Sequence, residues 1–250
     1  MSTLSAIIIT KNEEKQITAC LEALRFVDEI VVIDSESTDQ TKEICQKYQA
    51  KFQVSPWLGF GKQKQLALEA ASSDWILSVD ADEIITKELA EEILQIVKKE
   101  NLFNAYRVPR QTVFYNKALK HCCNPKKDTP IRLFKKEVAN FSNDLVHEKV
   151  VTSVETGTLK NHLLHYSFKS LTDLLNKANL YSTLGVDRLS KKGIQGGMLK
   201  AFGHAFWAFI RIYLLKGGFL DGWPGFLIAF SNFEGTFYRY AKLLEMQKYR

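Results

Sequence analysis

The stretch Trp75-Ile-Leu-Ser-Val-Asp-Ala-Asp-Glu83 is an apolar run that leads directly into three acidic residues. Similar apolar runs precede it at residues 5–10, 29–34 and, more weakly, 51–54, and helical patterns separate them at residues 14–25, 39–48 and 62–71. Ser37 or Thr38 could cap the helix at residues 39–48, because a hydroxyl group there can accept N–H groups of the first turn. Strands that alternate with helices in this way are typical of βαβ units. The first hundred residues therefore predict an α/β fold with a mostly parallel sheet flanked by helices.

The pattern changes after residue 104. Short β-like runs separated by turn residues predict antiparallel additions to the sheet, at residues 105–108, 112–115, 131–134 and 149–154. After Ser167, apolar residues recur at spacings of three and four, which predicts an amphipathic helix. Residues 201–240 contain thirteen aromatic side chains. We predict two parts, residues 1–166 and a helical, aromatic-rich C-terminal extension of residues 167–250.

The composition excludes several classes of protein. With 250 residues, 46% of them hydrophobic and 25% charged, the chain is neither disordered nor fibrous. Its four cysteines are too few for a disulfide framework, and their spacing matches no zinc site. The N-terminal fifteen residues lack the long apolar run of a signal peptide. These features predict a cytoplasmic protein.

Charge is distributed unevenly along the chain. Residues 1–100 hold 11 basic and 18 acidic side chains, a net charge of −7, whereas the remainder holds 23 and 10, a net charge of +13. The acidic first part argues against nucleic acid as a partner, and the lysine pairs at 126–127 and 191–192 are too short for a nucleic-acid surface. The basic second part could meet phosphate groups of a substrate or of a lipid surface.

The aromatic segment leaves two interpretations open. His204, Arg211, Lys216, Asp221 and Glu234 interrupt it, so we predict no membrane-spanning helix over residues 201–240. Tryptophan and phenylalanine beside lysine and arginine suit the headgroup boundary of a membrane, which would make the protein peripheral. The alternative is that these helices pack on the first part of the chain or on a partner subunit.

Acidic residues follow three of the predicted strands. Glu13 lies just past the first, Asp34 closes the second, and Asp80 and Asp82 follow the fourth. Ligands of open parallel sheets bind at this end of the strands. Carboxylates there suit the hydroxyl and N–H donors of a nucleotide, and Asp82 with phosphate oxygens suits Mg²⁺ or Mn²⁺. No Gly-rich phosphate-binding motif competes with this interpretation.

Several motifs in order resemble family 2 glycosyltransferases of the GT-A fold. They are Ile8-Ile-Thr-Lys-Asn-Glu-Glu14, Val31-Val-Ile-Asp-Ser-Glu-Ser-Thr-Asp39, Trp57-Leu-Gly-Phe-Gly-Lys-Gln-Lys-Gln65 and the stretch 75–83. The later motifs Arg132-Leu-Phe134, Val146-His-Glu148, His165-Tyr-Ser-Phe-Lys-Ser170 and Gly218-Phe-Leu-Asp-Gly222 are similar to WaaE/KdtX-type lipopolysaccharide core glycosyltransferases. The resemblance covers nearly the whole chain.

This resemblance implies a UDP-sugar donor and inversion at the anomeric carbon. It assigns Thr10, Glu13 and Asp34 to the base and ribose, Asp80 to the ribose, and Asp82 to the metal. Residues 1–166 would then be the nucleotide-sugar-binding and catalytic domain. Inversion needs a general base and a Lewis acid but no covalent nucleophile. Lys62 and Lys64 could add positive charge near the diphosphate, or they could be solvated helix lysines.

The general base stays open between two carboxyl groups. The Glu-Asp pair of many relatives is absent, and Glu148 is preferred over Asp144, with His147 as a residue that orients the base or binds metal or sugar. Arg132 could bind a phosphorylated acceptor or form an ordinary ion pair. His162 and His165 are expected to be structural.

The sequence thus predicts an inverting, metal-dependent transfer of a hexose, with glucose expected, from a UDP-sugar to a core heptose of lipopolysaccharide. The acceptor would be lipid-anchored at the inner face of the bacterial inner membrane. Two alternatives stay open. One is a nucleotidyltransferase, and the other is a non-catalytic carbohydrate-binding or membrane-scaffolding protein with the same fold.

Overall fold

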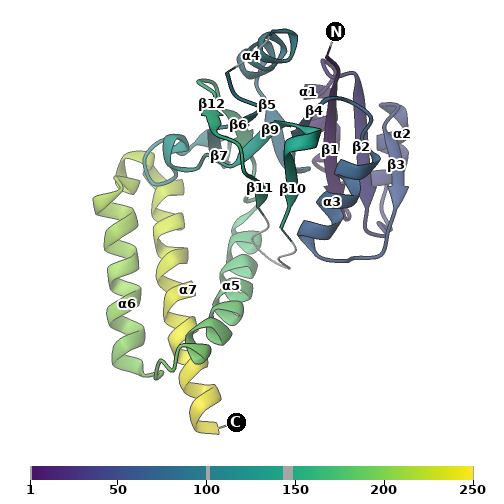
Figure 1. Cartoon of the computed structure of the whole chain (residues 1–250). Helices are drawn as coiled ribbons and strands as arrows, with labels where there is room; N and C mark the ends of the chain where they lie inside the picture. Colours follow the sequence, from purple (N-terminus) through teal and green to yellow (C-terminus); the bar gives the residue numbers. More distant parts are fainter. Residues whose placement is uncertain (1, 100–101, 143–148, 250) are drawn as a thin grey trace. The chain divides into compact units, whose positions relative to one another are not determined.

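The computed structural model describes residues 2–99, 102–142 and 149–249, which form two compact units (Figure 1). The first unit comprises the chain up to Gln111 together with Pro125–His165. The second comprises Thr112–Asn124 together with the chain from Tyr166 onward. The structure therefore groups residues 112–124, which the sequence placed before a boundary at 166, with the C-terminal helices.

A seven-stranded sheet forms the centre of the first unit, in the order β12-β6-β9-β4-β1-β2-β3. Parallel pairing joins β1 to β2 and β4, β2 to β3, and β12 to β6, whereas β9 is antiparallel to β4 and β6. The strands are β1 (Leu4–Thr10), β2 (Glu29–Asp34), β3 (Lys51–Val54), β4 (Trp75–Ser78), β6 (Ala105–Arg107), β9 (Ile131–Lys135) and β12 (Thr156–Thr158). The predicted mostly parallel sheet with antiparallel additions is confirmed.

Helices cover both faces of this sheet, because alternate residues of a strand point to opposite faces. Ala6 and Ile8 of β1 belong to one apolar cluster with α1 (Ile17–Ala23) and α4 (Lys87–Lys98). Ile7 belongs to another cluster with α3 (Phe60–Ala70). A parallel sheet buried on both faces explains why its strands read as continuous apolar runs.

Several local details differ from the sequence predictions. Helix α1 begins three residues later than predicted, and α4 was not predicted, although Thr86 caps it and its buried residues recur every four positions. The prediction that Ser37 or Thr38 caps α2 (Thr41–Lys47) was wrong, because the N-cap residue is Gln40 and the Asp39 carboxylate accepts the N–H group of Thr41. Ser37 instead bonds through its N–H and its hydroxyl group to Asp34.

Short antiparallel pairs complete the first unit. Strand β5 (Glu83–Ile85) pairs with β13 (Leu163–His165), and β10 (Ala139–Phe141) pairs with β11 (Val150–Thr152). Single 3₁₀ turns occur at η1 (Pro125–Lys127) and η2 (Lys136–Val138). The pairing of β5 with β13 matters for the site, because it brings residue 165 back beside the acidic stretch at residues 80–83.

Three long helices make up most of the second unit: α5 (Leu171–Lys191), α6 (Met198–Ile210) and α7 (Gly222–Tyr249) (Figure 1). A π-helical turn, η3 (Arg211–Leu215), and a 3₁₀ turn, η4 (Gly218–Asp221), join α6 to α7. Strand β7 (Arg110–Phe114) enters this unit and forms a hairpin with β8 (Lys117–Ala118). Side chains of this hairpin region, among them Phe114 and Leu119, share an apolar cluster with α7.

Asp221 fixes the turn before α7. Its buried carboxylate accepts the backbone N–H groups of Lys120, His121 and Cys122, and His121 Nδ1 lies 3.0 Å from Asp221 Oδ1. Burial disfavours the ionised carboxyl group, but the donors of Cys122 and His121 outweigh this and lower the pKa of Asp221. Asp221 therefore ties residues 120–122 to the end of η4.

One stretch among the described residues, Met198–Leu215, is long and apolar enough to cross a membrane by length and composition, and 17% of it is buried. The sequence argument against a span considered the whole segment to residue 240. This shorter stretch holds only Lys200 and Arg211 as charged residues. Length and composition therefore do not confirm the prediction that the aromatic segment stays outside the bilayer.

Candidate active site

The carboxyl ends of β1 and β2 bring two predicted site residues to one edge of the sheet. Thr10 ends β1 and donates its hydroxyl group to Asp34 Oδ1 at 2.8 Å, and Asp34 ends β2. Asp34 is only 2% exposed and also accepts the N–H group of Ser37 at 2.8 Å and its hydroxyl group at 2.6 Å. In this structure Asp34 therefore orients the loop after β2 beneath the site surface.

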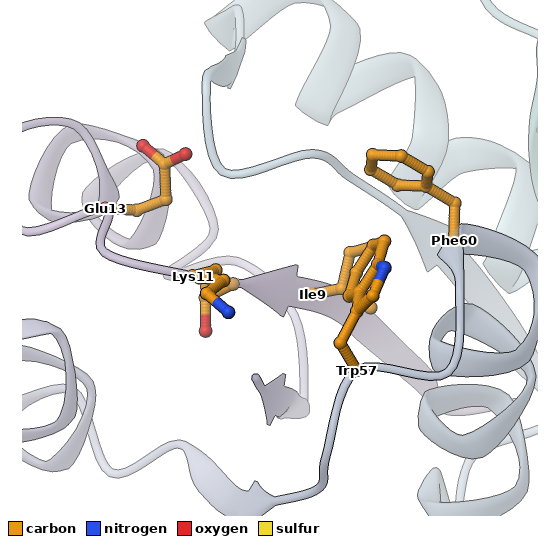
Figure 2. Close-up of a pocket in the computed structure, with 6 residues that line it drawn as sticks. Ile9, Lys11, Glu13, Trp57 and Phe60 are labelled. Atoms are coloured by element: carbon orange, nitrogen blue, oxygen red, sulfur yellow. The ribbon is translucent and has the colours of Figure 1, made fainter. Parts of the chain in front are cut away.

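A pocket of about 370 Å³ opens next to this edge. Its lining comprises Ile9, Thr10, Lys11, Glu13, Trp57 and Phe60. Figure 2 shows the rings of Trp57 and Phe60 on one side and the Glu13 carboxylate on the other. The two rings meet edge to face with centroids 4.7 Å apart. Pockets with apolar walls and a few polar groups are typical small-molecule sites.

The two aromatic residues were not among the predicted site residues. Trp57 and Phe60 are both about two-fifths exposed, although large apolar side chains usually lie in a core. Gly59 between them has a φ of 95°, in the left-handed region that glycine adopts readily. A sequence signal for these residues was available, because a tryptophan and a phenylalanine lie on either side of the glycine at the start of α3.

Asp80 is the centre of a set of buried charges. Lys64 Nζ lies 2.7 Å from Asp80 Oδ1, and the Arg132 guanidinium group donates to both Asp80 and Glu83. Arg110 Nη1 lies 3.5 Å from Glu83 Oε1. Buried ionic groups of this kind require several partners, since taking charges out of water is costly. No local pattern in the sequence indicates that residues 64, 80, 83, 110 and 132 meet.

The ionisation of this cluster follows from its geometry. Burial disfavours the Asp80 carboxylate, but Arg132 and Lys64 outweigh it and hold the pKa of Asp80 well below its usual range. Burial raises the pKa of Glu83 in spite of its contact with Arg132. Asp80 is therefore ionised at neutral pH, and both of its carboxylate oxygens are held by cations.

Asp82 lies two residues further on and contacts a histidine. Its Oδ2 lies 3.3 Å from His165 Nε2, and both side chains are partly exposed. Strand β13 provides this contact, because His165 is the register partner of Glu83. The sequence interpretation treated His165 as structural. No local pattern could have linked two residues that are more than eighty positions apart.

Asp82 and His165 are the residues that could hold a divalent cation. Among the residues that the structure describes, no group of three or more His, Cys, Asp or Glu side chains could form a metal site alone. Mg²⁺ and Mn²⁺ commonly use one or two protein ligands and take the rest from phosphate and water. A carboxylate beside an imidazole therefore fits a cation that is shared with a phosphorylated substrate.

The remaining predicted residues divide into three groups. Lys62 is exposed on α3, whereas Lys64 points into the Asp80 cluster. Arg132 is buried and ion-paired, in agreement with the ion-pair alternative for this residue. Asp144, His147 and Glu148, the predicted catalytic residues, lie outside the described residues.

Comparisons with known proteins give the family. The profile of "Glycosyl transferase family 2" matches residues 5–152. The chain is 33% identical over 258 residues to an uncharacterized glycosyltransferase of Rickettsia typhi, with 98% of this chain and 88% of the relative covered. It is 30% identical over 249 residues to the lipopolysaccharide core biosynthesis glycosyltransferase LpsC of Rhizobium meliloti, with 97% and 92% covered.

A solved structure shows the same fold. The crystal structure of residues 1–349 of Staphylococcus aureus TarS in complex with UDP-GlcNAc has a TM-score of 0.50 to this chain. The two are 16% identical, and the match covers 99% of this chain and 93% of that one. Because the family profile matches more than half of the chain and the relatives align along nearly all of it, the chain belongs to glycosyltransferase family 2, as an enzyme with the GT-A fold.

Proposed function

We propose that this enzyme is an inverting, metal-dependent glycosyltransferase that moves a hexose from a UDP-sugar to an inner-core sugar of lipopolysaccharide. The observation that carries the acceptor class is the similarity to LpsC, which extends over 97% of this chain and 92% of LpsC. Glucose as the hexose and heptose as the acceptor sugar are part of the same proposal. The acceptor would be anchored in the inner face of the bacterial inner membrane.

The pocket beside β1 supports a nucleotide donor. A flat base can stack on the exposed rings of Trp57 or Phe60, since aromatic side chains accept any base on their faces. Glu13, across the pocket from these rings, is an acceptor for N–H or hydroxyl donors of the base and ribose. Thr10 lies in the same lining and connects it to Asp34.

The charged cluster supports the placement of a diphosphate nearby. Asp82, with His165 beside it, would hold Mg²⁺ or Mn²⁺, which would supply a Lewis acid for the departing diphosphate. Lys64 and Arg132 hold Asp80 from two sides, so the backbone that carries Asp82 is fixed before substrate binds. Such preorganisation removes the cost of arranging the site during the reaction.

The acceptor hydroxyl must lose a proton to a general base during a single displacement. We propose Glu148 for this role, Asp144 as the second candidate, and His147 as a residue that orients the base. The variants Glu148→Gln, Asp144→Asn and His147→Asn separate the three roles. The base variant should lose turnover and retain affinity for UDP, whereas the positioning variant should retain part of its turnover and shift its pH profile.

The experiment for the whole proposal measures UDP release from a panel of UDP-sugars with a heptose-containing core acceptor. It is run with Mg²⁺, with Mn²⁺ and with chelator, and beside the variant Asp82→Asn. We expect release that depends on both metal and acceptor, and a decrease in turnover of about 10²–10³-fold in the variant. Asp187→Asn is the matched control, because it makes the same chemical change at an exposed position on α5, far from Asp82 in the sequence.

Each part of the proposal has its own contradicting result. Full turnover in chelator, or in Asp82→Asn, would overturn the metal site. UDP release that no core acceptor stimulates, but that another class of acceptor does, would contradict the assigned acceptor and leave the UDP-sugar donor in place. Binding of UDP without sugar transfer from any UDP-sugar would contradict the proposal that a UDP-sugar is the donor.

A further inference from the structure

Helix α6 buries its small side chains and exposes its large apolar ones. Ala205 is completely buried, and Ala201 and Ala208 lie on the same buried face, at spacings of four and three. The opposite face presents Leu199, Phe202, Phe206 and Trp207, of which Phe206 is 62% and Leu199 91% exposed. A helix in an aqueous protein normally places large apolar side chains toward the core. The outward face of α6 therefore suits an apolar environment.

Exposed apolar side chains also follow α6 along the chain, through the turns to the start of α7. Its further members are Leu214 and Leu215 in η3, Phe219 and Leu220 in η4, and Trp223 in α7. Helix α6 packs against α7, and the buried alanines allow the two helices to approach closely. We call the side chains of residues 199, 202, 206, 207, 214, 215, 219, 220 and 223 the apolar face. Clusters of exposed apolar side chains on soluble proteins can mark binding surfaces.

The charged residues between Asp187 and Asp221 have a single sign. Residues 188–220 contain six basic side chains and no acidic one: Arg188, Lys191, Lys192, Lys200, Arg211 and Lys216. All six are exposed. Lys200 and Arg211 lie within α6 and its continuation, and Lys216 follows η3. Cations beside exposed aromatic rings match an anionic lipid surface, where rings enter the headgroup boundary and cations contact phosphates.

We propose that the apolar face docks into the surface of an anionic lipid membrane, with α6 and the turns η3 and η4 in the headgroup region. Trp207 and Trp223 are the aromatic anchors, and Lys200, Arg211 and Lys216 contact the headgroups. The docking would give the enzyme access to an acceptor that is carried on lipid, and only this benefit rests on the proposed function. The surface itself stands on exposure and charge.

The test uses the full chain and vesicles that contain no glycan, so it reports on docking independently of sugar transfer. Flotation is compared for phosphatidylcholine vesicles with and without phosphatidylglycerol, and quenching of tryptophan fluorescence by brominated lipid is measured in parallel. We expect retention on the anionic vesicles, loss of retention at high salt, and quenching that decreases in Trp207→Ser. UDP release with a delipidated core acceptor is measured separately to judge the proposed function.

Two sets of variants separate the apolar and the charged contributions. The variant Phe206→Ser/Trp207→Ser should lose retention, and Lys200→Glu/Arg211→Glu/Lys216→Glu should weaken partitioning at least about tenfold. Val54→Ser/Leu102→Ser and Lys126→Glu/Lys127→Glu are matched controls at exposed positions of the first unit, and should bind as the parent does. Circular dichroism of each variant verifies that it is folded.

Three results would overturn the proposal. One is failure of the parent protein to bind anionic vesicles at low salt. The second is resistance of membrane-bound protein to alkaline carbonate, which would indicate that Met198–Leu215 spans the bilayer. The third is a lipid-free dimer that shields Trp207 from an aqueous quencher, which would make a second copy of the chain the occupant of the apolar face.

Discussion

The first compact unit buries several charged side chains, whereas the second exposes several large apolar ones. The first unit buries Lys64, Glu83 and Arg132 beside Asp80, and the second exposes residues such as Phe206 and Trp223. Both arrangements depart from the usual distribution, in which charges are solvated and large apolar groups are buried. Each departure costs free energy in a chain that has neither a ligand nor a membrane bound to it. The cost is understandable where a ligand or a lipid surface completes the arrangement.

The contrast also separates two kinds of sequence signal. The buried charges are scattered from residue 64 to residue 132, and only the fold collects them. The exposed aromatic residues are concentrated in one segment, and the structure decides only which of them face outward. A site built by strands from several βα units is therefore hard to read from sequence, whereas a surface on one helical hairpin is easier to detect.

The largest expected effect is on the buried charges. Arg132→Met removes the partner of both Asp80 and Glu83, so two carboxylates lose their main cation in a buried site. We expect a decrease in the free energy of unfolding of about 3–5 kcal/mol, measured by urea denaturation. Arg107→Met is the control, because Arg107 is exposed on β6. Equal stability of the two variants would contradict the importance of the cluster.

A phenylalanine pair tests the comparison of the two units directly. Phe134 is fully buried in the first unit, whereas Phe206 is exposed in the second. Phe134→Ala should lower the free energy of unfolding by about 3–5 kcal/mol, because it leaves a cavity. Phe206→Ala should change it by no more than about 0.5 kcal/mol. A large loss in Phe206→Ala would mean that the apolar face is part of a packed core.

The pocket is tested by removing one aromatic ring. Trp57→Ala should weaken UDP binding by about 1–3 kcal/mol if a base stacks on this side chain, as isothermal titration calorimetry can measure. Trp223→Ala removes an exposed tryptophan from the second unit, and its affinity for UDP should equal that of the parent. Unchanged UDP affinity in Trp57→Ala would show that the base does not stack on Trp57.

The smallest effect is expected at Asp221 and depends on pH. The pKa of Asp221 is lower in the folded chain than in the unfolded chain. Its contribution to the free energy of unfolding is therefore complete above the ordinary aspartate pKa and decreases as the pH falls below about 4. Asp221→Asn should lower the free energy of unfolding by about 1 kcal/mol at neutral pH and by less in acid. Denaturation of parent and variant from pH 7 to pH 3 measures this difference. A constant difference across that range would show that the charge of Asp221 is unimportant.

Much of the first unit was predictable because its strands are continuous apolar runs. The bounds of β2 and β3 agree with the predicted ones, and β1 and β4 agree within one residue. Helix α4 was missed although Leu89, Ile93 and Val97 recur every four positions, so the signal was present in the sequence. The cap of α2 was predicted wrongly because Ser37 bonds to Asp34, a choice that depends on the loop.

The candidate site was predictable only where strand ends define it. Asp34, Asp80 and Asp82 follow from the rule that parallel strands end at one edge, whereas Thr10 was assigned from the family resemblance. For Lys64 the sequence left a contact with the diphosphate or a solvated side chain open, and for Arg132 a contact with the acceptor or an ion pair. The structure pairs both with Asp80. His165 reaches Asp82 through the pairing of β5 with β13, and this non-local pairing leaves no periodic trace in the sequence.

The sequence by itself determined the α/β class, the edge where the acidic residues gather and the family, because apolar periodicity and local motifs encode these features. The tertiary structure alone decided that Asp80 is held between Lys64 and Arg132, that Asp82 meets His165, and that α6 turns its alanines inward. The physical reason is that burial and ion pairing depend on distances between residues that are remote in the chain. Those distances are set only when the strands pair and the helices pack.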